Sequence, residues 1–212
     1  MKMVLYFFPI TTAFSENNRA VQSRKRRVLA VFSERRVHCF LKTHQGLFDG
    51  FAIVDACSMP FSTVYKKELQ NIPFLKQIFA CVKAIALDRG DIRQGLAVIQ
   101  QVTKEVQAGR NYMIFAEGTR SRSKNQLLDF KGGSFKSAMK AKCPIVPVAL
   151  IDSYKVFDTG STERTTVQVH FLDALRYEDY RGLSTVEVAE LVKTAIEKAA
   201  IEKAIAEHDG GQ

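Results

Sequence analysis

Short apolar runs alternate with longer segments of helical periodicity from about residue 37 to the end of the chain. The runs are bounded by polar or turn-forming residues, which is typical of buried strands. The predicted strands are residues 37–41, 61–65, 84–87, 112–116, 145–151 and 166–172. Helices are predicted at 47–57, 73–83, 92–108 and 134–142, with a last helix that follows Ser184.

Two of the predicted helices carry explicit start signals. Asp91 can cap the helix that ends before Gly109, and Ser184 with Glu187 forms a capping box for the last helix. Apolar residues recur near helical spacing in both helices. In the first they are Ile92, Leu96, Ile99, Val102 and Val106.

This alternation of strands and helices predicts an α/β fold, a single domain with a mostly parallel or mixed β-sheet flanked by helices. We assign residues 37–208 to this domain and residues 1–36 to a separate basic, partly apolar segment. Functional groups of such sheets gather at the carboxyl ends of the strands. Candidate chemistry is therefore expected just after each predicted strand.

Most of the positive charge lies near the amino terminus. Residues 1–36 hold eight lysines and arginines against two glutamates, so they carry +6 of the net charge of +9. The cluster Arg24–Arg27 fits either contact with an anionic phospholipid surface or a solvated arm. We do not expect nucleic-acid binding, because no aromatic residues are interleaved with this cluster.

Other features exclude several function classes. Residues 3–14 are apolar but contain Pro9 and are too short to span a bilayer, so they either lie in a membrane interface or pack on the domain. The four cysteines form no C-x-x-C pair, which predicts reduced thiols and no zinc site. The chain lacks a nucleotide P-loop and a G-x-S-x-G elbow.

His44 follows the first predicted strand and is separated from Asp49 by four residues. Residues five apart do not share a face of a regular helix, so the two can meet only if His44 lies in the turn before the helix. The carboxylate would then fix the imidazole tautomer and stabilise the imidazolium, as a general base requires. The alternative is a surface histidine beside an unrelated aspartate.

The segment 117–122 follows the fourth predicted strand and combines a glycine turn with hydroxyls and two arginines. Backbone N–H groups and a guanidinium fork suit a phosphate monoester. The alternative is ion pairing of these arginines with surface acids. Lys66 and Arg89 also lie at strand ends, where each is a candidate phosphate ligand or a solvated charge.

Residues 40–172 resemble the glycerolipid acyltransferase family in four blocks that occur in the family's order. The first is an HX4D motif, and the third is the most specific. The blocks are HQGLFD at 44–49, KKEL with AIALDR at 66–69 and 84–89, FAEGTR at 115–120, and IVPV at 145–148.

By this resemblance His44 is the catalytic base and Asp49 orients it, while Pro147 shapes the acyl side of the site. The acceptor's phosphate would be bound by Lys66, Arg89, Glu117, Gly118, Thr119 and Arg120. The resemblance implies acyl transfer from acyl-CoA or acyl carrier protein (acyl-ACP) to the sn-2 hydroxyl of 1-acylglycerol-3-phosphate (lysophosphatidic acid), giving phosphatidic acid in phospholipid biosynthesis. It implies no metal, no cofactor beyond the thioester, and a peripheral enzyme on the cytoplasmic face of an anionic membrane.

Two other functions stay open at this level. The acceptor can be glycerol-3-phosphate or another lysophospholipid, because acceptor choice depends on the shape of the pocket. A non-catalytic protein that binds anionic lipid would use the same basic arm and the same phosphate loop.

Overall fold

The computed structural model describes residues 38–41, 46, 48–57, 59–158 and 166–209. The segment 1–36 and His44 lie outside these residues, so what was predicted for them stays a prediction. Strands and helices alternate along the described chain, which confirms the predicted α/β fold.

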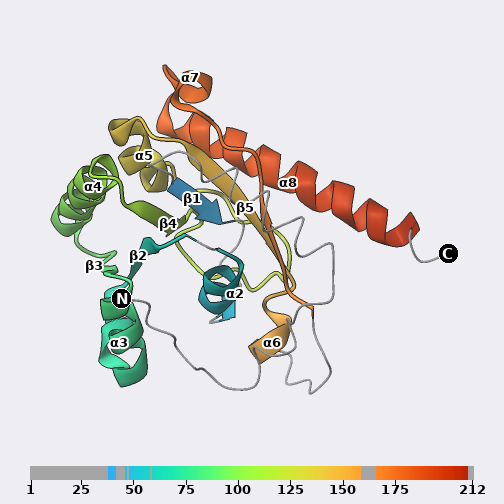
Figure 1. The fold of residues 1–212 in the computed structure, drawn as a ribbon, viewed down its shortest axis with the longest axis horizontal. Helices are drawn as coiled ribbons and strands as arrows, with labels where there is room; N and C mark the ends of the chain where they lie inside the picture. The colour runs from blue at the N-terminus through green and yellow to red at the C-terminus, as the bar shows by residue number, and fades with distance from the viewer. Residues whose placement is uncertain (1–37, 42–45, 47, 58, 159–165, 210–212) are drawn as a thin grey trace.

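The described strands form one mixed sheet. They are β1 (His38–Leu41), β2 (Phe61–Lys66), β3 (Ile85–Leu87), β4 (Asn111–Phe115), β5 (Ile145–Ile151) and β6 (Gln168–Phe171). Their order across the sheet is β3-β2-β4-β1-β5-β6 (Figure 1). The first five run parallel to their neighbours, and β6 is antiparallel to β5 at one edge.

Helices cover both faces of this sheet. On one face lie α4 (Ile92–Gln107), α5 (Lys136–Ala141) and α8 (Thr185–Asp209), and on the other lies α2 (Phe48–Ala56) (Figure 1). In β4, Tyr112 packs in the cluster with α4, α5 and α8, whereas the adjacent Met113 packs with Ile53 of α2. This division follows from the two-residue period of a strand, and it makes β4 a strand buried on both faces.

Several shorter elements complete the described chain. They are the 3₁₀ turns η2 (Lys67–Asn71) and η3 (Gly132–Phe135) and the helices α3 (Pro73–Cys81), α6 (Lys155–Asp158) and α7 (Tyr177–Tyr180). Of these, η2, α6 and α7 were not predicted, because elements of four or five residues are too short to show a helical period. Among the described helices, none combines the length and apolar composition that a bilayer crossing requires.

Both predicted helix caps are confirmed. The Asp91 carboxylate accepts two backbone N–H groups from the first turn of α4, at 2.9 and 3.0 Å. The Ser184 N–H donates to the Glu187 carboxylate at 2.7 Å, and the Glu187 N–H donates to the Ser184 hydroxyl at 3.3 Å. The capped helix α8 then buries Val188, Val192 and Ile196 against the sheet.

Gly132 is a position where the fold leaves no room for a side chain. A Cβ there would lie 2.9 Å from Thr185 Oγ1 and 3.2 Å from the Thr185 carbonyl carbon, at the start of α8. We expect Gly132→Ala to lower the free energy of unfolding by about 1–3 kcal/mol, because backbone must shift to admit the methyl group. Thermal unfolding measures this, with Gly133→Ala as control, since a Cβ at Gly133 meets nothing within 4 Å. Equal losses in the two variants would contradict the prediction.

Candidate active site

The carboxyl ends of β1 to β5 share one edge of the sheet, because these strands run in the same direction. Lys66 ends β2, and Arg89 and Gly118 follow β3 and β4 within a few residues. All three residues line one cavity. The structure thus brings together three residues that the sequence had placed at separate strand ends.

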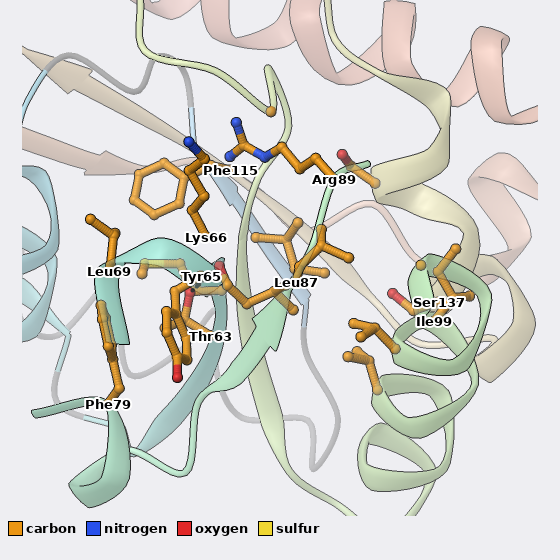
Figure 2. A pocket seen from close by; sticks show the side chains of 18 of the residues that line it. Thr63, Tyr65, Lys66, Leu69, Phe79, Leu87, Arg89, Ile99, Phe115 and Ser137 are labelled. Carbon is orange, nitrogen blue, oxygen red and sulfur yellow. Dashed lines mark hydrogen bonds between the residues drawn. The ribbon is translucent and has the colours of Figure 1, made fainter. Parts of the chain in front are cut away.

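The cavity has a volume of about 660 Å³ and mostly apolar walls, built by α2, β2, α3, α4 and β4. The rings of Tyr65 and Phe79 stack with their centroids 3.8 Å apart. Figure 2 shows these two rings on the side of the cavity away from the charged ends of Lys66 and Arg89. An apolar cavity of this size can bury a hydrocarbon chain.

The apolar stripe of α4 divides between this cavity and the core. Val102 and Val106 are buried in the core cluster. Ile92 and Leu96, in the first turns of the helix, are 81% and 51% exposed and line the cavity. The amino-terminal half of α4 therefore forms a cavity wall that is open to solvent.

Among the described residues, four cations line the cavity: Lys66, Arg89, Lys131 and Lys136. The side chains of Lys66 and Arg89 reach the same end of the cavity, beside the ring of Phe115 (Figure 2). Several cations facing one cavity create a positive potential that attracts an anionic group. One end of this mostly apolar cavity is therefore suited to an anion.

Asp88 and Asp91 also line the cavity, and both carboxylates accept hydrogen bonds from nearby backbone N–H groups. Asp88 accepts the Gly90 N–H at 3.0 Å and the Lys67 ammonium at 3.4 Å, and these two groups lower the pKa of Asp88. Lys66 pairs with Glu68 at 2.8 Å, but both side chains are exposed. Exposed ion pairs are weak, so this one does not hold Lys66 against a competing anion.

Lys131 was missed by the sequence analysis. It follows a long loop and not a strand, so the strand-end rule does not select it. Its N–H donates to the Ala116 carbonyl at 2.9 Å, and its side chain crosses Gly118, where a Cβ would lie 3.1 Å from Lys131 Cδ. Gly118 also has a φ of +65°, a conformation that favours glycine. Gly118 therefore admits both the turn and the lysine that crosses it.

Asp49, in the first turn of α2, is fully buried. Its two carboxylate oxygens accept the Gly46 N–H at 3.1 Å each, and Oδ1 also accepts the Ser153 hydroxyl at 2.5 Å. Gly46 lines the cavity, so the carboxylate lies directly behind the cavity wall. A buried carboxylate requires such hydrogen bonds, and they fix its orientation.

Residues 35–151, more than half of the 212-residue chain, match the family model described as Acyltransferase. This chain belongs to that Acyltransferase family. The 1-acyl-sn-glycerol-3-phosphate acyltransferases of Salmonella typhimurium and Escherichia coli are each 28% identical to it over 173 residues, covering 80% of this chain and 70% of theirs. The crystal structure of the 1-acyl-sn-glycerophosphate (LPA) acyltransferase from Thermotoga maritima shares its fold, with a TM-score of 0.66 at 18% identity, covering 92% of this chain and 86% of that one.

The loop after β4 of this acyltransferase divides its predicted phosphate ligands. Glu117 is 1% exposed, and its Oε1 accepts the Leu128 N–H at 3.2 Å. The Glu117 carboxyl group therefore shapes the loop, and its part in phosphate binding stays a prediction. Thr119 and Arg120 are exposed and are not among the described residues that line the cavity. Gly118 is the member of this segment that lines the cavity.

The remaining predicted residues of the acyltransferase site are Pro147 and His44. Pro147 is buried in β5 opposite Phe40 of β1, its carbonyl accepts the Leu172 N–H at 2.9 Å, and it is not among the described lining residues. Its role on the acyl side stays a prediction. His44 lies outside the described residues, two positions before Gly46 in the sequence.

Proposed function

We propose that this acyltransferase moves an acyl group from a thioester to the sn-2 hydroxyl of 1-acylglycerol-3-phosphate, giving phosphatidic acid. One observation carries the proposal: a single cavity joins a cationic end to apolar walls. A lysophosphatidate has the same division, with a phosphate headgroup at one end and a hydrocarbon chain at the other. The names of the Salmonella typhimurium and Escherichia coli relatives support this acceptor.

In the proposed reaction, His44 accepts the proton of the sn-2 hydroxyl while that oxygen attacks the thioester carbonyl carbon. The tetrahedral intermediate expels the thiolate, which takes the proton from the imidazolium, and an ester bond replaces the thioester bond. Asp49 fixes the imidazole tautomer and stabilises its charged form. The buried carboxylate suits this role, because its partner Gly46 is only two residues from His44 in the chain.

We assign the acceptor's phosphate to Lys66, Arg89 and Lys131. A phosphate monoester carries close to two negative charges and offers several acceptor oxygens, which match a guanidinium fork and ammonium groups. Thr119 and Arg120 contribute from the exposed side of the turn at Gly118, as the EGTR motif implies. Glu117 supports this loop through its bond to Leu128.

The acyl donor is a thioester of coenzyme A or of acyl carrier protein. The apolar side chains of the cavity contact the hydrocarbon chain that the substrates bring. We expect neither a metal nor a further cofactor, because the imidazole base and the thiolate leaving group complete the proton balance.

The proposed place of reaction is the cytoplasmic face of a membrane, with the enzyme bound peripherally. Phosphatidic acid has two hydrocarbon chains and stays in a bilayer. Phe51, Val54, Ile92 and Leu96 are exposed and also line the cavity, so its opening is apolar. Lipid can pass between a bilayer and such an opening without exposing its chain to water. The basic segment 1–36 would add attraction to anionic lipids.

Release of free thiol from acyl-CoA, with lysophosphatidate and glycerol-3-phosphate as parallel acceptors, tests the proposal. We expect kcat/KM to be more than about 10-fold higher with lysophosphatidate, because burial of only two methylene groups contributes about 1.6 kcal/mol. Faster release with glycerol-3-phosphate would reassign the acceptor. Binding to lysophosphatidate vesicles without any thiol release would leave a non-catalytic lipid-binding protein.

A further inference from the structure

Ser153 lies at the carboxyl end of β5, at the same edge of the sheet as the other strand ends. It is 1% exposed, and its hydroxyl donates to Asp49 Oδ1 at 2.5 Å across 104 residues of sequence. Both groups lose their water on burial, so loss of either partner would leave the other buried and short of a hydrogen bond. The hydroxyl therefore helps to satisfy the buried carboxylate and to fix its orientation.

The turn that carries Ser153 is itself held in a conformation that side chains seldom adopt. Asp152 has a φ of +65°, and reciprocal hydrogen bonds with Asn125 hold it: Asn125 Nδ2 donates to Asp152 Oδ1 at 2.8 Å, and the Asp152 N–H donates to Asn125 Oδ1 at 3.0 Å. The Lys155 ammonium binds the other Asp152 oxygen at 2.9 Å. Such a backbone persists where surrounding contacts determine it, and it sets the direction of the next residue.

Asn125 belongs to the loop that continues from residues 117–120, the EGTR segment. The Asn125–Asp152 pair therefore ties the proposed phosphate loop to the turn that holds the Asp49 carboxylate. These bonds connect three strand ends: β4 through the loop, β5 through Ser153, and β1 through the segment that contains Asp49.

We propose that Ser153 is a positioning residue for the acyl-transfer reaction, which holds the Asp49 carboxylate in the orientation that His44 requires, and that the Asn125–Asp152 pair sets Ser153 in place. The inference rests on the proposed function, since it gives Asp49 its role toward the imidazole. The Gly46 N–H bridges both carboxylate oxygens, whereas the Ser153 hydroxyl binds Oδ1 and so distinguishes one oxygen from the other.

The test is the kinetics of Ser153→Ala, Ser153→Thr and Ser153→Val in the full chain, with thiol release from acyl-CoA as the readout. Threonine and valine have nearly the same volume and differ in the hydroxyl, so any crowding is equal in the two variants. We expect Ser153→Ala and Ser153→Val to lower kcat on the order of 10-fold with little change in either KM, and Ser153→Thr to restore most of it. Asn125→Ala is expected to lower kcat in the same direction.

Ser62→Ala is the matched control, because Ser62 is also a buried serine with a side-chain partner, but that partner is Arg110, at 3.4 Å, and not the Asp49 carboxylate. It should leave kcat unchanged. A wild-type kcat in Ser153→Ala, or equal kcat values in Ser153→Thr and Ser153→Val, would overturn the inference. Lack of thiol release by the wild-type protein would instead overturn the proposed function, so the two failures are distinguishable.

Discussion

Replacement of His44 by alanine is expected to lower kcat for thiol release by about 10²–10⁴-fold, while the thermal unfolding temperature stays close to that of the wild type. The acceptor hydroxyl is a weak acid and loses its proton only as its oxygen attacks the thioester. Without the imidazole, water must accept that proton, and the buried Asp49 cannot substitute because it lies behind the cavity wall. Thiol release at saturating acceptor and donor measures the effect.

The control for this variant is His170→Ala. His170 lies in β6, at the edge of the sheet, where its ring nitrogen contacts Gln168 at 3.1 Å, and it is not among the described cavity-lining residues. Activity should persist there. Near-normal turnover in His44→Ala would remove the base from the mechanism, even if the rest of the site were correct.

Arg89→Ala should raise the KM for lysophosphatidate by roughly 10–100-fold, because a hydrogen bond to a charged group contributes about 1.5–3 kcal/mol. The kcat at saturating acceptor should change much less. The proposed phosphate ligands Lys66, Arg89 and Lys131 bind the headgroup in the ground state as well as in the transition state. Initial rates over a range of acceptor concentrations, at two ionic strengths, separate these constants. The rise should be larger at low salt.

Arg93→Ala is the matched control for Arg89→Ala. Arg93 is an exposed arginine in the first turn of α4, close to Arg89 in the sequence, and does not line the cavity. Lys131→Met extends the test, because methionine keeps an apolar stem over Gly118 and removes the charge. An acceptor KM that rises equally in Arg89→Ala and Arg93→Ala would mean that surface charge, and not the cavity, attracts the lipid.

Much of the fold follows from local pattern. The predicted strand 145–151 matches β5 at both ends, since an apolar run between turn residues is nearly unambiguous. Asp91 and Ser184 mark helix starts because their side chains satisfy specific N–H groups. The parallel sheet then carries Lys66 and Arg89 to one edge, which is why a rule about strand ends found them without any knowledge of tertiary contacts.

The rule about strand ends does not find side chains whose position depends on turn geometry or on tertiary contacts. The motif treats Glu117 to Arg120 as one group, but a turn with positive φ at Gly118 points successive side chains in different directions. Lys131 reaches the cavity only because its loop returns beneath the Ala116 carbonyl, a tertiary contact with no sequence pattern. Ser153 follows β5 by two residues, so it also lies where functional groups of such a sheet gather.

The position of β1 in the sheet affects when the polypeptide can fold during its synthesis on the ribosome. β1 pairs on one side with β4 and on the other with β5, and both partners are synthesised long after it. Contacts between such distant segments form late in folding. A nascent chain that has emerged only as far as β4 therefore lacks one neighbour of β1 and the hydroxyl that contacts Asp49. We expect acyl transfer to begin only after β5 has been synthesised, so incomplete chains are inactive.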